Sequence, residues 1–343
     1  MLANKANWLV RNTPAQVMIV TTDQHGLMPF FNLDPRIRCI DLDIGYEDNN
    51  GGSFIDKLIH YPGKQKVHRR RLTALLMAER ADVVVSMFCN DASFLTKIKD
   101  GSRKILEIHF SRYKRLQYGR GGLWAVADRL RSINDKRIAR SFDRFVVLTS
   151  EDRGYWEAGG PMPNICVIPN ARTFRPAAAE TIDNGSHTVL AVGRYNAQKA
   201  FDRLIDIWAL IKDKPQAEGW TLRIVGDGEL RPELQAQIDR LSLGGSVVLG
   251  GAETDMRSVY QSAGIYAMTS LYEGLPMVLL EAQASGLPIV SMACKCGPRD
   301  VVTDGLDGFL VPEGDNAAMA DRLLKLMADD GLRAGMSAAA LAA

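Results

Sequence analysis

Short apolar runs recur along the whole chain and alternate with stretches whose apolar residues are spaced three or four positions apart. A short apolar run predicts a buried strand, and the wider spacing predicts a helix with one face on a core. Strands that alternate with helices in this way form a parallel sheet covered on both faces, so the sequence predicts an α/β protein. The predicted strands are Val17–Thr21, Ile40–Ile44, Val83–Met87, Ile105–Ile108, Phe145–Thr149, Ile165–Ile168, Thr188–Val192, Leu222–Val225, Val247–Leu249, Ile265–Met268, Ile289–Ser291 and Phe309–Val311.

One stretch near the middle of the chain interrupts this alternation. Phe174–Ser186 is rich in Ala, Pro, Asn and Gly and has few large apolar residues, which is typical of a linker. A length of 343 residues is compatible with two domains. We therefore predict an N-terminal Rossmann-like domain at 1–174, a linker at 175–187 and a C-terminal Rossmann-like domain at 188–343.

The composition narrows the cellular setting. Hydrophobic residues make up 46% and charged residues 24%, as in ordinary soluble globular proteins. The net charge of +2 gives no case for nucleic acid, and the five scattered cysteines predict neither a disulfide framework nor a zinc site. Neither a signal peptide nor an apolar run long enough to span a bilayer is evident. We expect a cytoplasmic protein, with a peripheral membrane position as an option.

The segment 103–144 is unusually basic for this chain. Its twelve Lys and Arg residues against four Asp and Glu residues leave a charge of +8, and aromatic residues are interleaved with them. Such a segment suits an anionic membrane surface. A solvated charged helix is the commoner origin of a charge run, and nucleic acid is a weaker third option because no recognised binding motif accompanies the segment.

The stretch Ser270–Glu281 predicts a ligand site. It follows the apolar run Ile265–Met268, and Pro276 is suited to starting a helix that Gly286 can end. The residues between them would form a strand-to-helix turn at the carboxyl end of a parallel strand, where ligands of open α/β sheets bind. The free N–H groups at the start of a helix suit a diphosphate.

Glu273 and Glu281, with G-L-P between them, resemble the E-x7-E motif of retaining glycosyltransferases of family 4, which have the GT-B fold. A glutamate pair alone is weak evidence. Three further stretches match in family order: V-G-R-Y-N-A-Q-K at Val192–Lys199, I-V-G-D-G-E at Ile224–Glu229 and D-G-L-D-G-F-L-V at Asp304–Val311. The resemblance implies two Rossmann-like domains that face a cleft.

The resemblance also implies an activity. The protein would move a sugar from a nucleotide-sugar donor, expected to be a UDP-sugar, to a saccharide or polyprenyl-diphosphate-linked acceptor, with retention of configuration. No cofactor or metal is implied. The segment Ser291–Asp300 resembles members that build lipid-linked surface polysaccharides.

Roles carry over to matching positions. His109 and Glu273 would be catalytic, with His109 at the reaction centre and Glu273 on the donor sugar. Glu281 would bind the ribose. The other predicted donor-binding residues are Gly193, Arg194, Lys199, Gly274, Leu275, Pro276 and Met277.

Two alternatives remain open at the level of the sequence. One is a GT-B sugar-nucleotide epimerase, and the other is a truncated fragment that binds nucleotide without transferring sugar. The second arises because GT-B domains begin with a strand and a Gly-rich turn, whereas this chain opens in a predicted helix at Leu2–Val10. We therefore expect an N-terminal domain without its first strand, and a chain without the last helix of the family.

Overall fold

The computed structural model describes residues 2–29, 31–49, 54–113, 123–173 and 185–343. The chain divides into two compact units. The first comprises Met1–Ile108, Val126–Val147 and Gly159–Cys166, and the second comprises His109–Ala125, Leu148–Ala158 and Val167–Ala343. The predicted linker at 175–187 lies mostly outside the described residues, and the predicted domain limits stay a prediction.

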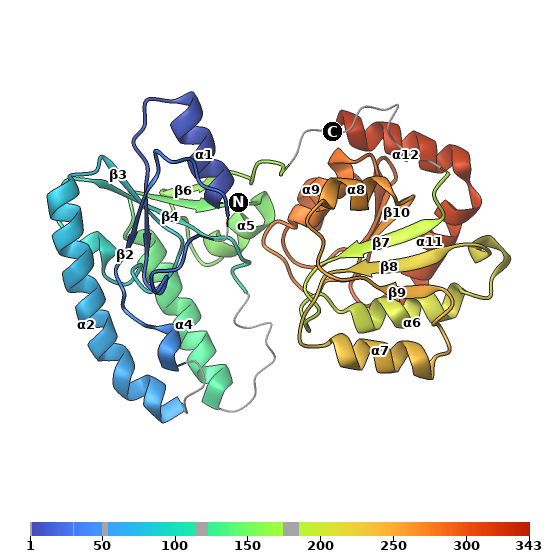
Figure 1. Cartoon of the computed structure of the whole chain (residues 1–343), viewed down its shortest axis with the longest axis horizontal. Helices are drawn as coiled ribbons and strands as arrows, with labels where there is room; N and C mark the ends of the chain where they lie inside the picture. Colours follow the sequence, from blue (N-terminus) through green and yellow to red (C-terminus); the bar gives the residue numbers. More distant parts are fainter. Residues whose placement is uncertain (1, 30, 50–53, 114–122, 174–184) are drawn as a thin grey trace. The chain divides into compact units, whose positions relative to one another are not determined.

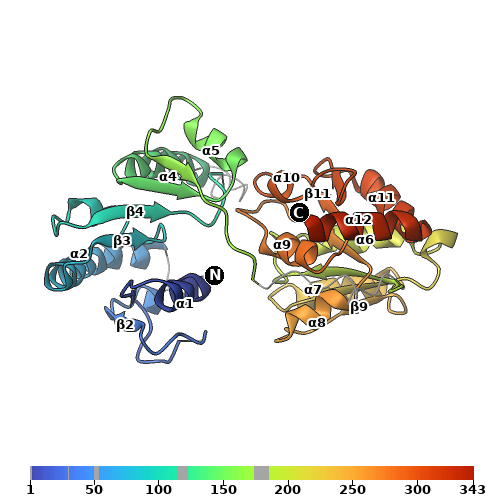
Figure 2. The same cartoon turned by 90° about the horizontal axis from the view of Figure 1, so that it is seen from above.

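The first unit contains two sheets within its described residues. A parallel pair consists of β1 (Met18–Thr21) and β2 (Arg38–Asp41). The second sheet has the order β3-β4-β5-β6, with β3 at Val83–Ser86, β4 at Arg103–Glu107, β5 at Arg144–Val147 and β6 at Ile165–Val167. Its helices are α1 (Leu2–Asn12), α2 (Phe54–Glu79) and α4 (Leu123–Arg140). Figure 2 shows α4 on one side of β3 and β4 and α1 on the other.

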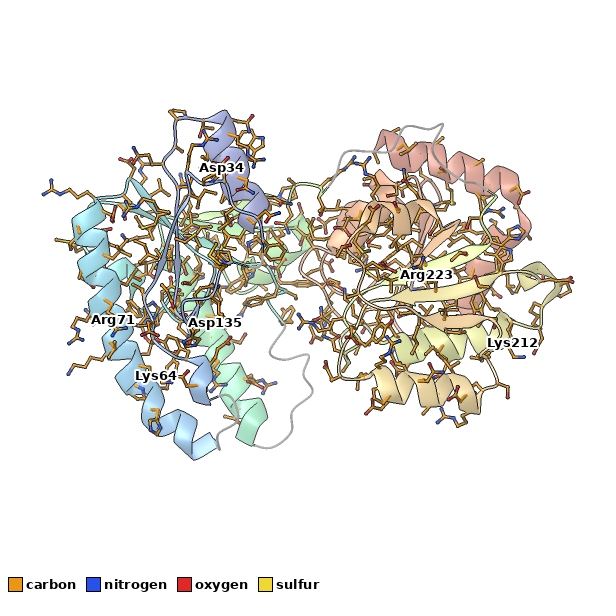
Figure 3. The ribbon with its side chains drawn as sticks, viewed as in Figure 1. Asp34, Lys64, Arg71, Asp135, Lys212 and Arg223 are labelled. Atoms are coloured by element: carbon orange, nitrogen blue, oxygen red, sulfur yellow. The ribbon has the colours of Figure 1, made fainter. Side chains whose placement is uncertain are left out.

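Helix α1 is fixed to the chain that leads into β2. Ala3, Ala6 and Val10 are its buried residues, as expected of an amphipathic helix. Arg11 of the helix donates to the Asp34 carboxylate at 3.1 Å. Hydrogen bonds from Arg36 and Arg11 hold the pKa of Asp34, labelled in Figure 3, well below its usual range.

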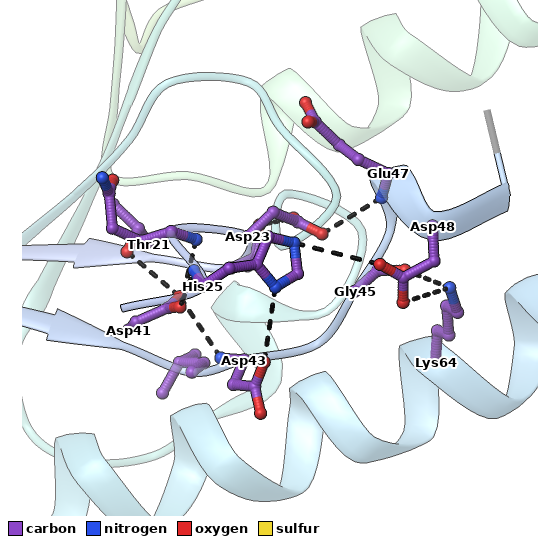
Figure 4. A network of polar contacts seen from close by, with 12 residues as sticks. Thr21, Asp23, His25, Asp41, Asp43, Gly45, Glu47, Asp48 and Lys64 are labelled. Atoms are coloured by element: carbon purple, nitrogen blue, oxygen red, sulfur yellow. Dashed lines mark hydrogen bonds and ion pairs between the residues drawn. The ribbon is translucent and has the colours of Figure 1, made fainter. Parts of the chain in front are cut away.

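The predicted strand Ile40–Ile44 is wrong in its second half, because β2 ends at Asp41. The Asp41 carboxylate accepts hydrogen bonds from the backbone N–H groups of Gln24 and His25, both at 3.0 Å. Figure 4 shows this network, in which Asp43 also contributes its N–H to Asp41. The Asp41 carboxylate therefore shapes a turn after β2, because it accepts backbone N–H groups from Gln24, His25 and Asp43.

The second unit is built on a parallel sheet with the order β12-β11-β10-β7-β8-β9 in the described residues (Figure 1). Its strands are β7 (Thr188–Val192), β8 (Thr221–Val225), β9 (Val247–Leu249), β10 (Ile265–Met268), β11 (Ile289–Met292) and β12 (Gly308–Val311). Its helices are α5 (Ser150–Glu157), α6 (Phe201–Ile211), α7 (Arg231–Arg240), α8 (Met256–Gln261), α9 (Met277–Ala284), α10 (Pro298–Val301), α11 (Asn316–Ala328) and α12 (Asp330–Ala342).

Alternate residues of each strand face opposite sides of this sheet, and both sides are buried. Ile265 and Ala267 of β10 join one core with α6, α7 and α11, whereas Tyr266 and Met268 join another with α8 and α9. Burial on both sides explains why these strands are continuous apolar runs. The predicted parallel sheet covered on both faces is confirmed.

The small residues near the end of the sequence are helical, because α12 runs through Ala342. The Asp329 side chain caps the helix by accepting from the Leu332 N–H at 2.8 Å. Met336 and Ala340 are buried against the rest of the unit. The small residues therefore form a packed helix, because Asp329 caps its start and Met336 and Ala340 anchor it to the core.

Candidate functional site

The strand-turn-helix unit predicted around Glu273 is present. Every residue of β10 is buried, and the chain then turns into α9, which begins at Met277 directly after Pro276. Gly286 has a φ of 68°, the left-handed conformation that ends a helix. The turn therefore lies at the carboxyl end of β10, next to the first N–H groups of α9.

Glu273 and Lys199 form an ion pair in this turn. The Lys199 ammonium lies 2.7 Å from one Glu273 carboxylate oxygen, and both side chains are largely buried. Gln198 donates to the Tyr272 carbonyl at 2.9 Å and lies 3.5 Å from the other Glu273 oxygen. Lys199, which is predicted to bind phosphate, and Glu273, which is predicted to bind the donor sugar, therefore contact each other. Sequence reasoning missed Gln198, although it directly precedes Lys199.

Gly193 is needed for the path of the Lys199 side chain. A Cβ at position 193 would lie 2.9 Å from the Lys199 Cε, so the lysine stem runs over the glycine toward Glu273. Arg194, the next residue, is exposed. The loop after β7 therefore presents one cation to Glu273 and one to solvent.

Tyr195 fixes this loop, and sequence reasoning did not single it out. Its ring is buried, and its hydroxyl lies 2.7 Å from the Ile224 carbonyl oxygen and 2.6 Å from the Gly250 carbonyl oxygen, which share its one donor proton. Burial raises its pKa to about 12. A Cβ at Gly226 would lie 1.9 Å from the Gly193 carbonyl oxygen. The loops after β7, β8 and β9 therefore pack against one another. Gly226 of the motif I-V-G-D-G-E allows the backbone of the loop after β8 to approach that of the loop after β7 closely.

Glu281 engages two hydroxyl groups. One carboxylate oxygen accepts from Thr173 at 2.7 Å and the other accepts from Tyr260 at 2.8 Å. Tyr260 is fully buried, whereas Thr173 is exposed. A carboxylate that takes a hydroxyl on each oxygen has the chemistry required for a diol.

The backbone at His109 lies against Gly274. A Cβ at Gly274 would come within 2.6 Å of the His109 carbonyl oxygen, so only glycine fits this approach. The segment that begins at His109 belongs to the second unit. The structure therefore places the predicted residue His109 beside the predicted turn through its main chain.

A buried aspartate holds this segment in place. The Asp152 carboxylate of α5 accepts from the Arg112 N–H at 2.8 Å, from the Trp156 indole at 3.1 Å and from the Cys296 thiol at 3.4 Å. Burial raises the pKa of the Asp152 carboxyl, and it also raises the pKa of the Cys296 thiol. Cys296 therefore serves as a buried donor, since a reactive thiol needs a lowered pKa.

The loop that carries Cys296 supports the turn from its other side. Glu151 accepts from the Cys296 N–H at 3.0 Å. A Cβ at Gly297 would lie 2.2 Å from Pro276 Cδ and 3.2 Å from the Leu275 Cα. The segment after His109, α5 and the loop after β11 thus enclose the residues 274–276. Met277 follows as the first residue of α9.

Other candidate sites are weaker. Within the described ranges, no group of three or more His, Cys, Asp or Glu side chains could hold a metal ion. A depression of about 610 Å³ lies at the amino ends of β3 and β4, lined by Arg80, Ala81, Asp82, Val83, Asp100, Gly101 and Arg103. It contains none of the predicted site residues, and its mixed charges define no ligand. We place the site at the turn before α9.

Comparison with known proteins defines first the fold and then the family. A sucrose-phosphate synthase from Thermosynechococcus elongatus has a TM-score of 0.81 over 99% of this chain and 87% of that protein, at 19% identity. TarM of S. aureus, in complex with UDP, has a TM-score of 0.64 over 79% of this chain and 55% of that protein, at 22% identity. The fold is GT-B, as predicted.

Residues 186–329 match the family model of "Glycosyl transferases group 1". The amylovoran biosynthesis glycosyltransferase AmsD of Erwinia amylovora is 36% identical over 203 residues, which are 58% of this chain and 56% of that protein. An uncharacterized glycosyltransferase of Haemophilus influenzae is 31% identical over 61% of this chain and 58% of that protein. The matched part of the chain thus spans a little more than half the length of each of these two relatives.

Proposed function

We propose that this protein is a retaining glycosyltransferase of family 4 that takes its sugar from a UDP-sugar. The observation that carries the proposal is the buried pair of Lys199 and Glu273 at the turn before α9, within the residues that match the group 1 family model. Support for the nucleotide comes from TarM, whose structure contains UDP.

The proposed roles follow from charge and position. Arg194, Lys199 and the N–H groups at the start of α9 hold the diphosphate, and Glu281 holds the ribose diol. Glu273 orients the donor sugar and His109 lines the reaction centre. During transfer the bond from the anomeric carbon to the diphosphate breaks, and a bond to the acceptor oxygen forms on the same face. The acceptor proton leaves with the diphosphate.

We further propose that no metal takes part. Two cationic side chains, Arg194 and Lys199, can balance the charge that develops on the leaving diphosphate, which is one of the tasks of a metal ion. Activity should persist in EDTA. Loss of activity in EDTA with recovery on adding Mg²⁺ or Mn²⁺ would contradict this part of the proposal.

The acceptor is proposed to be a saccharide or a polyprenyl-diphosphate-linked saccharide. A relative in Campylobacter jejuni, 28% identical over 58% of this chain, is named for an acceptor on PP-undecaprenol. An enzyme that uses a lipid-linked acceptor must act at a membrane surface. We therefore propose a cytoplasmic protein that binds an anionic membrane surface through 103–144, of which 114–122 lie outside the described residues. Within those described, no helix is long and apolar enough to cross a bilayer.

The test is a donor screen with UDP-, GDP- and ADP-sugars, in which nucleotide release is measured with and without membrane lipid. We expect release from a UDP-sugar that depends on the lipid. Nucleotide release that does not require an acceptor and that produces free sugar would indicate an epimerase. Binding of the nucleotide sugar without release of nucleotide would indicate a nucleotide-binding fragment.

A variant series tests the site itself. Arg194→Ala should lower kcat/KM about 100-fold or more, because a charge that stabilises the transition state is lost. Arg240→Ala is the matched control, since Arg240 is equally an exposed arginine but ends α7. Equal kcat/KM in the two variants would show that Arg194 does not contact the diphosphate.

A further inference from the structure

Helix α4 has three large apolar residues on its exposed side. Val126, Leu130 and Ile133 are 56%, 62% and 67% exposed. In contrast, Asp128 and Ser132 are buried on the inner face, with 3% and 5% exposure. An ordinary surface helix has the opposite arrangement, with apolar residues on the core and polar residues in water.

These exposed residues form one stripe. At about 100° per residue, Val126, Leu130 and Ile133 fall within about 60° of one another on the helix surface. Arg137 lies on the same stripe and is exposed. Arg129 and Arg140, also exposed, flank it along one edge. We call these six residues the α4 face.

The acidic residues of the helix do not oppose this charge. Its two acids are Asp128 and Asp135, and both lie on the inner side, where Arg131 is 3.9 Å from Asp128. Figure 3 labels Asp135 on this helix. The α4 face therefore combines an apolar stripe with positive charge alone.

The chemistry of the α4 face distinguishes among possible partners. Three aliphatic side chains on one helix are a small area beside the roughly 800 Å² per partner that a stable protein interface requires. Aliphatic side chains also lack the rings on which unpaired bases stack. An apolar stripe flanked by arginine is the pattern of a helix that lies in a bilayer interface, with guanidinium groups at the headgroups.

We propose that the α4 face docks on an anionic lipid surface. Val126, Leu130 and Ile133 would enter the boundary between headgroups and acyl chains, while Arg129, Arg137 and Arg140 would contact the lipid phosphates. The inference rests on the proposed membrane association and assigns it to one helix face. It adds nothing to the transfer chemistry, which lies in the second unit.

The test is co-sedimentation with vesicles of phosphatidylcholine, with and without phosphatidylglycerol. The double variant Leu130→Glu/Ile133→Glu should bind the anionic vesicles at least about tenfold more weakly than wild type. Arg137→Gln should bind about fivefold more weakly, and its deficit should shrink at high salt. The control is Leu210→Glu, an exposed leucine of α6 with 55% exposure, which should bind like wild type.

The outcomes separate the proposals. If the wild-type protein does not co-sediment with anionic vesicles, membrane association itself is refuted. Binding of the double variant equal to wild type would refute the α4 assignment and leave membrane association standing. A change of oligomeric state in the double variant, with vesicle binding intact, would identify the face as a protein contact. The melting temperature measured without lipid should be equal in all variants, which shows that each remains folded.

Discussion

Replacing Lys199 by Met isolates the energetics of the site. The ammonium lies 2.7 Å from the Glu273 carboxylate, and the two side chains are 16% and 9% exposed. Coulomb's law gives a gross attraction of about 6 kcal/mol at an effective dielectric constant of about 20. Desolvation offsets most of that attraction. Removing one member of a fully buried pair costs about 3–5 kcal/mol, and the remaining exposure of Lys199 reduces this to about 2–3 kcal/mol.

The assay is thermal unfolding followed by tryptophan fluorescence, since Trp208 and Trp220 are buried in the second unit. A loss of about 2–3 kcal/mol should lower the Tm by about 4–12 °C for a unit of this size. The matched control is Lys212→Met. Lys212, labelled in Figure 3, pairs at 2.8 Å with Asp213, which is 81% exposed, so its loss should change the Tm little.

A double variant completes the cycle. Lys199→Met with Glu273→Gln removes the buried charge together with its partner, so most of the lost stability should return. Two results would refute this prediction: a Tm of Lys199→Met equal to that of wild type, or a Tm of the double variant no higher than that of Lys199→Met. In either case the carboxylate would not depend on the ammonium.

Three further changes test other parts of the structure. Gly274→Ala places a Cβ 2.6 Å from the His109 carbonyl and should cost about 1–3 kcal/mol and weaken UDP binding in calorimetry; unchanged binding would contradict the predicted turn. Tyr195→Phe removes a hydroxyl that serves two carbonyls and should cost about 1–3 kcal/mol in urea unfolding. Because burial raises the pKa of Tyr195 to about 12, its contribution should hold below about pH 10 and be lost as pH rises through about 12, a loss that the Phe variant lacks. Burial lowers the pKa of His68, a buried residue of α2, below its ordinary value of about 6.5, so its contribution to stability should be present above that pH and fall as pH decreases below it; a His68→Gln variant with the same acid slope would refute this.

The sequence by itself determined the elements around the site. The apolar run of β10, Pro276 before α9 and Gly286 after it are local signals, and the structure follows each of them. Strand periodicity likewise predicted the parallel sheet of the second unit. Such signals work because backbone conformation and burial of one face depend on neighbouring residues.

Other local signals failed where a tertiary contact decided the outcome. The D-x-D at Asp41 and Asp43 alternates like a strand, yet Asp41 turns the chain by accepting backbone donors from Gln24 and His25. The exposed stripe of α4 could not be seen either, because spacing shows that a helix has two faces and not which of them meets the core.

The site itself was decided by the order of strands. Lys199 follows β7 and Glu273 follows β10, and 74 positions separate them in the sequence. They form an ion pair because β7 and β10 are neighbours in the sheet, which brings the loops after both strands to one edge. In a parallel sheet the crossover connections set which strands become neighbours, and no local pattern of residues records that order.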